Sequence, residues 1–249
     1  MFSEEGFNRL INVLTRLDIP HSVHKVIPFT HHLEPEINPK GPVIVMGTYT
    51  LAEIAKNRGW EPGSFLNDNF NFIRQRYYWK DAMLNHMAAI CHFDCVPIEY
   101  VPFFIRPVTD SKAFTGQVID WKEYEEWRNR ILSLSPEDYC TLKPDTEVMI
   151  CSPKTIYSEY RTWIIDEKVV TASQYKMGST KYYSSLVDQP ILDFAEYNAQ
   201  IWSPARAYCM DVAWTPGGLK IVEVNNINSS GFYEANMQKL VEGLEGMVW

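Results

Sequence analysis

Apolar positions in the first third of the chain recur first at helical spacing and then in a short run. Just after Ser3, which can cap a helix, apolar residues stand three or four apart until Pro20, which would end that helix. The apolar run 42–47 predicts a short buried strand. A second helix is expected from a cap at Thr50 to Gly59.

The pattern changes further along the chain. The run 102–107 predicts a strand, and an aromatic stripe over 121–134 predicts an amphipathic helix. From residue 147, apolar and polar residues alternate with a period of two, which favours strands and hairpins. The elements expected there are a strand at 148–151, a hairpin of 160–165 and 168–175, a helix at 191–201, a hairpin of 207–214 and 219–224, and a helix at 234–244.

Composition narrows the class of protein. The chain has 249 residues, 46% of them hydrophobic and 14% aromatic, which is enough to build a substantial core. Its net charge of -8 and its lack of a Lys/Arg-rich run argue against nucleic acid as a partner. No apolar run approaches the roughly 18 residues of a membrane span, and five scattered cysteines are typical of a reducing compartment. We therefore expect a soluble, cytoplasmic protein.

Common catalytic motifs are missing from the sequence. It contains no P-loop, no G-x-G-x-x-G, no G-x-S-x-G and no H-E-x-x-H. His21 and His24, or the cluster from Cys91 to Cys95, could be metal ligands. Ordinary surface positions are the favoured interpretation, because no second Cys/His pair stands at zinc spacing.

The last predicted hairpin carries the most informative polar residues. Asp211 and Glu223 would face each other across the turn at Gly217, and Asn225 would share the face of Glu223. Two carboxylates and an amide oxygen suit Mg²⁺ that also binds nucleotide phosphates. The alternative is an outward polar face on a solvated hairpin.

Basic residues elsewhere make that alternative weaker. Arg106 and Lys112 flank a short polar loop, Arg161 lies on a predicted strand, and Lys176 ends the partner of that strand. Singly, each is typical of a surface charge. Positioned cations together with a metal are what phosphoryl transfer requires, because negative charge spreads over the phosphate oxygens.

The order of these basic and acidic residues along the chain resembles that of the ATP-grasp superfamily, and in particular its R-to-K (arginine-to-lysine) clade of bacterial and phage proteins. The similarity extends over roughly residues 100–235. The matching stretches are 104–116, 158–166, 170–175, Asp211-Val212 and Glu223-Val224-Asn225.

The resemblance implies an α+β ATP-grasp fold in which two α+β subdomains sandwich ATP. It implies an ATP-grasp domain at 71–249, divided into subdomains 71–147 and 148–249. Residues 1–70, with their expected helix, strand and helix, would form a small α/β pre-ATP-grasp domain.

The resemblance also assigns roles to residues of this sequence. Arg106 would take the place of a lysine common in other ATP-grasp ligases, and Lys112 would lie in a mobile loop over the phosphates. Residues 148–152 would form a hinge whose backbone contacts adenine, and Asp211, Glu223 and Asn225 would hold magnesium. The expected nucleotide-binding residues are Arg106, Lys112, Met149, Ile150, Cys151, Glu159 and Lys176, and the expected catalytic residues are Arg161 and Lys112.

The implied activity is an ATP- and Mg-dependent ligase. It would join a carboxylate (an amino acid, a peptide or a protein terminus) to an amine or thiol through an acyl-phosphate, and release ADP and phosphate. Two alternatives remain open. One is an ATP-grasp kinase acting on a small molecule or an RNA end, and the other is a non-catalytic nucleotide-binding protein.

We predict that residues 108–115 form a lid that opens to admit ATP, since the segment is polar and has few apolar anchors besides Phe114. Lys112→Ala should lower turnover more than it lowers stability. Hydrogen exchange with and without ATP tests the lid. Protection in this segment equal to that of the flanking strands in both states would contradict it.

Overall fold

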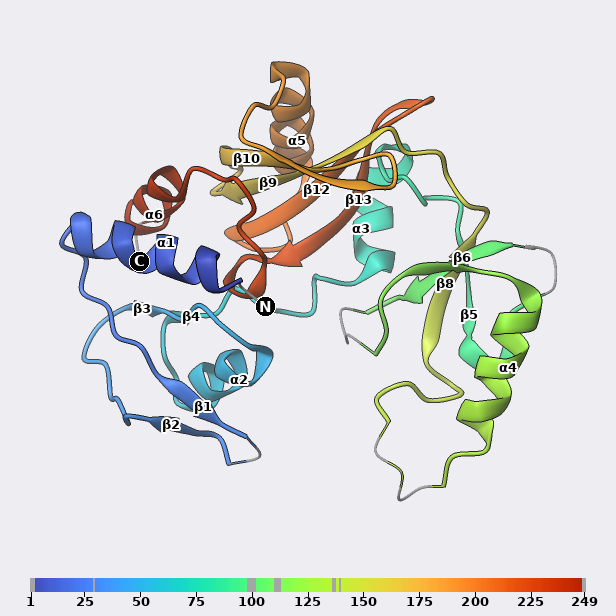
Figure 1. The fold of residues 1–249 in the computed structure, drawn as a ribbon, viewed down its shortest axis with the longest axis horizontal. Helices are drawn as coiled ribbons and strands as arrows, with labels where there is room; N and C mark the ends of the chain where they lie inside the picture. Colours follow the sequence, from blue (N-terminus) through green and yellow to red (C-terminus); the bar gives the residue numbers. More distant parts are fainter. Residues whose placement is uncertain are drawn as a thin grey trace. The chain divides into compact units, whose positions relative to one another are not determined.

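The chain forms two units, each with its own sheet (Figure 1). The computed structural model describes residues 3–28, 30–97, 102–109, 113–135, 138 and 140–247. The first unit joins Met1–Asp68 to Ile156–Trp249, and the second unit is Asn69–Thr155. Within the described ranges, no helix is long and apolar enough to cross a membrane. The division into functional domains at residues 70 and 147 stays a prediction.

The first unit is built on a five-stranded antiparallel sheet of order β11-β10-β9-β12-β13. Both hairpins expected from the alternating pattern are present, and the predicted strand positions are confirmed to within a few residues. The strands are β9 (Ser158–Ile165), β10 (Lys168–Met177), β11 (Thr180–Ser184), β12 (Ala207–Thr215) and β13 (Gly218–Asn226).

Helices cover both faces of this sheet, which is why every residue of β9 is buried. Trp163 and Ile165 point to the face packed by α6 (Met237–Glu245) and α1 (Glu4–Arg16). Tyr208 points the other way, where its hydroxyl lies 3.2 Å from the hydroxyl of Ser203, just after α5 (Gln189–Ile201). The part of the Trp163 face that α6 does not cover can therefore hold polar side chains.

The N-terminal part of the first unit contains small elements that the sequence pattern showed only in part. Ser3 caps α1 as expected, its hydroxyl accepting from the Gly6 amide. The expected strand at 42–47 is shorter, because only two of its residues find a parallel partner. The elements are β1 (Lys25–Ile27), β2 (His32–Glu34), β3 (Val43–Ile44), α2 (Tyr49–Asn57) and β4 (Pro62–Gly63).

Two expected helix starts were wrong. Thr48, not Thr50, caps α2, because Thr48 is extended and its hydroxyl accepts from the amide of Leu51 at 3.3 Å. The last helix begins at Met237 behind an Asn236 cap rather than at residue 234. Asn236 has an extended backbone, with a ψ of 98°, and its side chain accepts from the amide of Lys239, so the helix begins after it.

A single asparagine ties the N-terminal segment to the sheet. Asn228, in the short helix η3 (Ile227–Ser229) after β13, donates to the carbonyl of Val45 at 2.7 Å and accepts from the amide of Phe65 at 2.9 Å. Its own carbonyl accepts from the amide of Gly47 at 2.7 Å. These bonds satisfy backbone groups that end the short β3–β4 pair, and so fix them to the strand that carries Glu223 and Asn225.

The second unit contains a four-stranded antiparallel sheet of order β5-β8-β6-β7. A capping box at Asp120 starts α4, whose Tyr124 donates to the carbonyl of Phe93 at 2.5 Å inside the core. The elements are α3 (Phe72–Trp79), η1 (Lys80–Ala82), β5 (Ala89–His92), η2 (Phe93–Cys95), β6 (Phe103–Pro107), β7 (Gln117–Ile119), α4 (Trp121–Leu132) and β8 (Glu147–Cys151).

Two glycines near β4 provide a matched test of backbone geometry. Both have positive φ, +66° at Gly59 and +61° at Gly63, but only at Gly63 would a Cβ lie 2.6 Å from the Trp60 carbonyl oxygen. We expect Gly59→Ala to cost about 1–2 kcal/mol for the left-handed backbone. Gly63→Ala should cost about 1–3 kcal/mol more, because the backbone must move. Urea unfolding measures both, and equal costs would contradict the close approach.

Candidate functional site

Three neighbouring strands of the first unit bring the predicted site residues to one face. Asp211 on β12 pairs directly with Arg161 on β9 and with Glu223 on β13. The prediction that Asp211 and Glu223 are cross-strand neighbours is confirmed. Asn225, two residues on from Glu223, points to the same side and hydrogen-bonds both carboxylates.

A buried ion pair lies at the centre of this face. Nε of Arg161 donates to Oδ1 of Asp211 at 2.8 Å, and Nη2 donates to Oδ2 at 2.7 Å. The residues are only 7% and 1% exposed. Burial raises the pKa of Asp211 and the Glu223 and Glu159 charges add to this, while Arg161 opposes it. Among the guanidinium nitrogens of Arg161, Nε and Nη2 make the bonds to Asp211, and Nη1 takes no part in this pair.

Asn225 occupies the position between the two carboxylates. Its Nδ2 lies 3.0 Å from Oε1 of Glu223 and 3.4 Å from Oδ2 of Asp211. An amide N–H group is electropositive, so it stands where a cation would be attracted. A turn of the amide would present its oxygen there instead, giving the oxygen ligands that Mg²⁺ prefers. The residues present therefore fit a magnesium ion.

A second ion pair involves Glu159, which lies two residues before Arg161 on β9. Glu159 accepts from the hydroxyl of Tyr175 at 2.8 Å and pairs with Nζ of Lys176 at 2.7 Å. Adjacent strand residues normally point to opposite faces, but the register between β9 and β10 shifts between Gln174 and Lys176. This bulge lets both Tyr175 and Lys176 reach one carboxylate.

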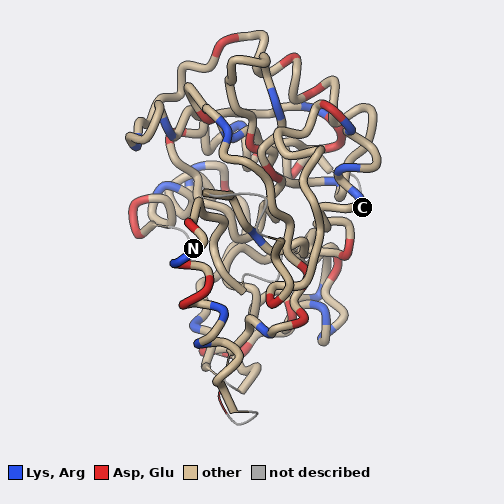
Figure 2. Tube along the Cα trace, turned by 90° about the vertical axis from the view of Figure 1, so that its right-hand side faces the viewer, with Lys and Arg blue, Asp and Glu red and all other residues tan. Residues whose placement is uncertain are grey.

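Carboxylates and cations gather on this face of the sheet. The cluster holds the carboxylates of Glu159, Asp211 and Glu223 against the cations of Arg161 and Lys176. In the part of the chain that is described, no group of three or more His, Cys, Asp or Glu side chains is arranged to hold a metal by itself. Along the rest of the trace acidic and basic positions are interspersed (Figure 2). A cation here would need further oxygens from a ligand such as a phosphate.

Tyrosine rings that were not among the predicted site residues cover Arg161. Tyr233 stacks between Tyr175 at 5.0 Å and Tyr183 at 5.6 Å between ring centroids. The guanidinium carbon of Arg161 lies 5.1 Å from the Tyr233 centroid and 5.8 Å from that of Tyr175. Tyr175 falls within a stretch that carries the family resemblance, and that was the only available signal.

The position of Tyr233 is set from α1. Nη1 and Nη2 of Arg9 donate to the carbonyls of Tyr233 and Ala235, at 2.5 and 2.7 Å. The amide of Glu234 also donates to the hydroxyl of Ser173 on β10. These bonds hold the segment between β13 and α6 across the sheet, with its tyrosine over Arg161.

The second unit carries the remaining described candidates. Arg106 lies on β6 with its guanidinium 5.9 Å from the ring of Phe72, whose ring also lies 5.4 Å from Arg76. Lys112 and its neighbours 110 and 111 lie outside the described residues. Beyond them, Phe114 packs against Trp127, with 4.8 Å between ring centroids.

The predicted adenine strand, β8, is an interior strand. Met149 pairs with Ile90 on one side and Arg106 on the other, and Ile150 pairs with Ala89 and Ile105. Their backbone polar groups are thus engaged in the two ladders. The adenine role of Met149, Ile150 and Cys151 stays a prediction, and the backbone outside the ladders begins at residue 152.

The fold is that of an ATP-grasp domain. The chain belongs to family 3 of the R-to-K clade of ATP-grasp domains, and the model of this family matches residues 26–244. The resemblance predicted from the sequence is confirmed at the level of the clade. No curated protein sequence matches the chain.

Solved structures confirm the α+β ATP-grasp fold. One is the ATP-grasp ligase PsnB complexed with its minimal precursor, with a TM-score of 0.55 and 12% identity over 98% of this chain and 95% of that chain. Another is a RimK domain ATP-grasp protein from Sphaerobacter thermophilus, with a TM-score of 0.54 and 14% identity over 89% and 87% of the two chains. The roles of the individual site residues stay predictions.

Replacing each carboxylate separately tests which one the buried arginine depends on. Asp211→Asn leaves Arg161 buried without its carboxylate, which should cost about 3–5 kcal/mol. Glu223→Gln keeps both the Arg161–Asp211 pair and the acceptor for Asn225, so it should melt well above Asp211→Asn. Thermal unfolding in EDTA measures both variants. Equal destabilisation by the two substitutions would contradict a sheet that depends on the Arg161–Asp211 pair.

Proposed function

We propose that the protein is an ATP- and Mg-dependent ligase that joins a carboxylate to an amine or thiol through an acyl-phosphate. The observation that carries the proposal is the arrangement around Arg161. Asp211 holds its guanidinium by two bonds that use Nε and Nη2, and the oxygen-bearing side chains of Glu223 and Asn225 lie on the same face. Membership of an ATP-grasp family supports ATP as the phosphoryl donor.

The proposed reaction has two steps. A carboxylate oxygen of the substrate attacks the γ-phosphorus of ATP, the bond to the β-phosphate oxygen breaks, and ADP leaves. An amine nitrogen or thiol sulfur then attacks the acyl carbon, phosphate leaves, and the attacking atom loses a proton. Neither step needs a nucleophile from the protein. Positioning and charge neutralisation are the contributions required of its side chains.

The site residues of the first unit can supply these contributions. Arg161 would present Nη1 to the transferred phosphoryl group, and its pairing with Asp211 removes the freedom it would otherwise lose on binding. Lys176, held by Glu159, would neutralise phosphate charge. Magnesium would be held by Asp211, Glu223 and Asn225, and would supply electrostatic stabilisation of the phosphate oxygens when bound.

The second unit would supply the remaining nucleotide contacts. Arg106, whose guanidinium lies near the buried Phe72 ring, and Lys112 in the predicted lid are proposed to contact phosphates. The β8 strand around Met149, Ile150 and Cys151 is proposed to contribute the adenine contacts. A peptide or protein terminus is one candidate for the carboxylate, and PsnB, a ligase of the same fold, was solved with a precursor.

Product analysis tests this proposal. The protein is incubated with Mg²⁺, ATP, hydroxylamine and pools of amino acids or peptides. We expect ADP, inorganic phosphate and a hydroxamate, because hydroxylamine traps an acyl-phosphate. Glu223→Gln should remove most of the activity and its dependence on Mg²⁺. The exposed Glu242→Gln on α6 is the matched control and should change neither.

Each other product pattern has a distinct meaning. ADP with a stable phosphorylated product and no free phosphate would replace the ligase by a kinase. AMP and pyrophosphate would contradict both, since they require attack at the α-phosphate. A higher melting temperature with Mg²⁺–ATP but no product would leave a non-catalytic nucleotide-binding role, and no shift in melting temperature would contradict nucleotide binding itself.

A further inference from the structure

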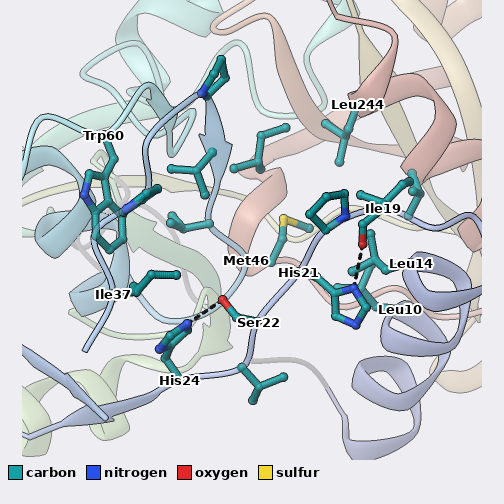
Figure 3. Close-up of a pocket in the computed structure, with 18 of the residues that line it drawn as sticks. Leu10, Leu14, Ile19, His21, Ser22, His24, Ile37, Met46, Trp60 and Leu244 are labelled. Carbon is teal, nitrogen blue, oxygen red and sulfur yellow. Dashed lines mark hydrogen bonds between the residues drawn. The ribbon is translucent and has the colours of Figure 1, made fainter. Parts of the chain in front are cut away.

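A pocket of about 690 Å³ lies within the first unit, in its N-terminal part (Figure 3). Helices α1 and α6 and strand β3 form its walls, together with two irregular, proline-containing segments at 19–24 and 37–42. None of the site residues on β9, β12 and β13 lines it. It is therefore a separate feature from the Arg161 site.

Most residues that line this pocket are apolar, with a smaller polar part. Of the 27 residues that line it, 21 are apolar, and its walls include the buried core residues Leu10, Leu240 and Leu244. Ligand pockets of proteins typically have volumes of about 300–1,000 Å³ and are mostly apolar with few polar groups. The size and lining of this pocket agree with that description.

The polar side chains at the pocket are largely engaged with the chain itself. Nδ1 of His21 donates to the carbonyl of Ile19 at 2.8 Å, and Nδ1 of His24 donates to the carbonyl of Pro35 at 2.6 Å. Nε2 of His24 lies 2.7 Å from the hydroxyl of Ser22 (Figure 3). Among the described residues, none of the buried side-chain N or O atoms without a partner belongs to the lining.

The charges of the lining favour no ion. One lysine, Lys40, and one glutamate, Glu245, line the pocket, so their formal charges cancel. A charged ligand would lose much of its hydration among apolar side chains, and the one lysine and one glutamate together offer no net charge to compensate it. An uncharged, apolar ligand meets no such cost, and it gains by leaving water.

We propose that this pocket binds a small, uncharged, apolar molecule. The ligand would lie against Leu10, Leu240 and Leu244, and any polar group it carries would lie at the mouth between segments 19–24 and 37–42. This binding needs neither ATP nor turnover, so it can be tested independently of the ligase proposal.

Fluorescence of N-phenyl-1-naphthylamine, an uncharged apolar probe, tests the proposal on the full chain without nucleotide. We expect the fluorescence to rise and saturate at one probe per chain. Decan-1-ol should displace the probe, and decanoate should displace it at least tenfold less effectively. Ile37→Asp places a charge in the lining and should weaken binding at least tenfold, whereas Ile37→Leu should not. The matched control is Leu186→Asp, which adds the same charge at an exposed leucine of the first unit outside the pocket.

Other results would overturn the proposal. Absence of saturable binding, equal displacement by decanoate, or equal weakening by Leu186→Asp would each do so. A dimer in sedimentation that Ile37→Asp dissociates would assign the pocket to a second copy of the chain. If Ile37→Asp does not fold, Val23→Asp replaces it, because Val23 lines the pocket and is 55% exposed.

Discussion

The buried pair of Arg161 and Asp211 constrains how the strands of the first unit can be arranged. Two charges that are almost fully removed from water must meet in good geometry, or their desolvation destabilises the fold. That geometry requires β9 and β12 in one register, and the next strand then places Glu223 opposite Asp211. The folded sheet thus holds the carboxylates together before any ligand binds. Such preorganisation is what phosphoryl transfer needs.

The aromatic cover of this pair extends the constraint to distant parts of the sequence. Tyr233 lies over Arg161, yet its backbone is held by Arg9 from α1, and its ring stacks on Tyr183 from the edge strand β11. Stacked rings limit access of water to the guanidinium while leaving its charge intact. The N-terminal helix therefore helps to shape the site although it contributes no group to the chemistry we propose.

The sequence predicted those features that follow from periodicity and missed those that depend on its interruption. Counting alternate residues placed Glu223 and Asn225 on one face, but the pairing of Asp211 with Glu223 also needs a one-residue shift of register between Asp211 and Val212 that the pattern does not show. The same counting could not reveal that a bulge turns Tyr175 and Lys176 toward one carboxylate. Short elements such as β1, β4 and β11 went unpredicted because too few residues carry their pattern. The apolar pocket is lined by segments far apart in the chain, so no local sequence pattern predicts it.

The first unit is assembled from both ends of the sequence, with the second unit inserted between them, and this affects how the protein is made. Leu10 of α1 shares its core with Leu240 of α6, so the apolar stripe of α1 stays uncovered on the ribosome until nearly the whole chain has emerged. The inserted segment 69–155 contains its own sheet and core, so it can fold before the C-terminal part of the chain has been synthesised. Folding during translation should consequently begin in the middle of the sequence, and the nascent N-terminal helix is the segment that depends most on chaperones.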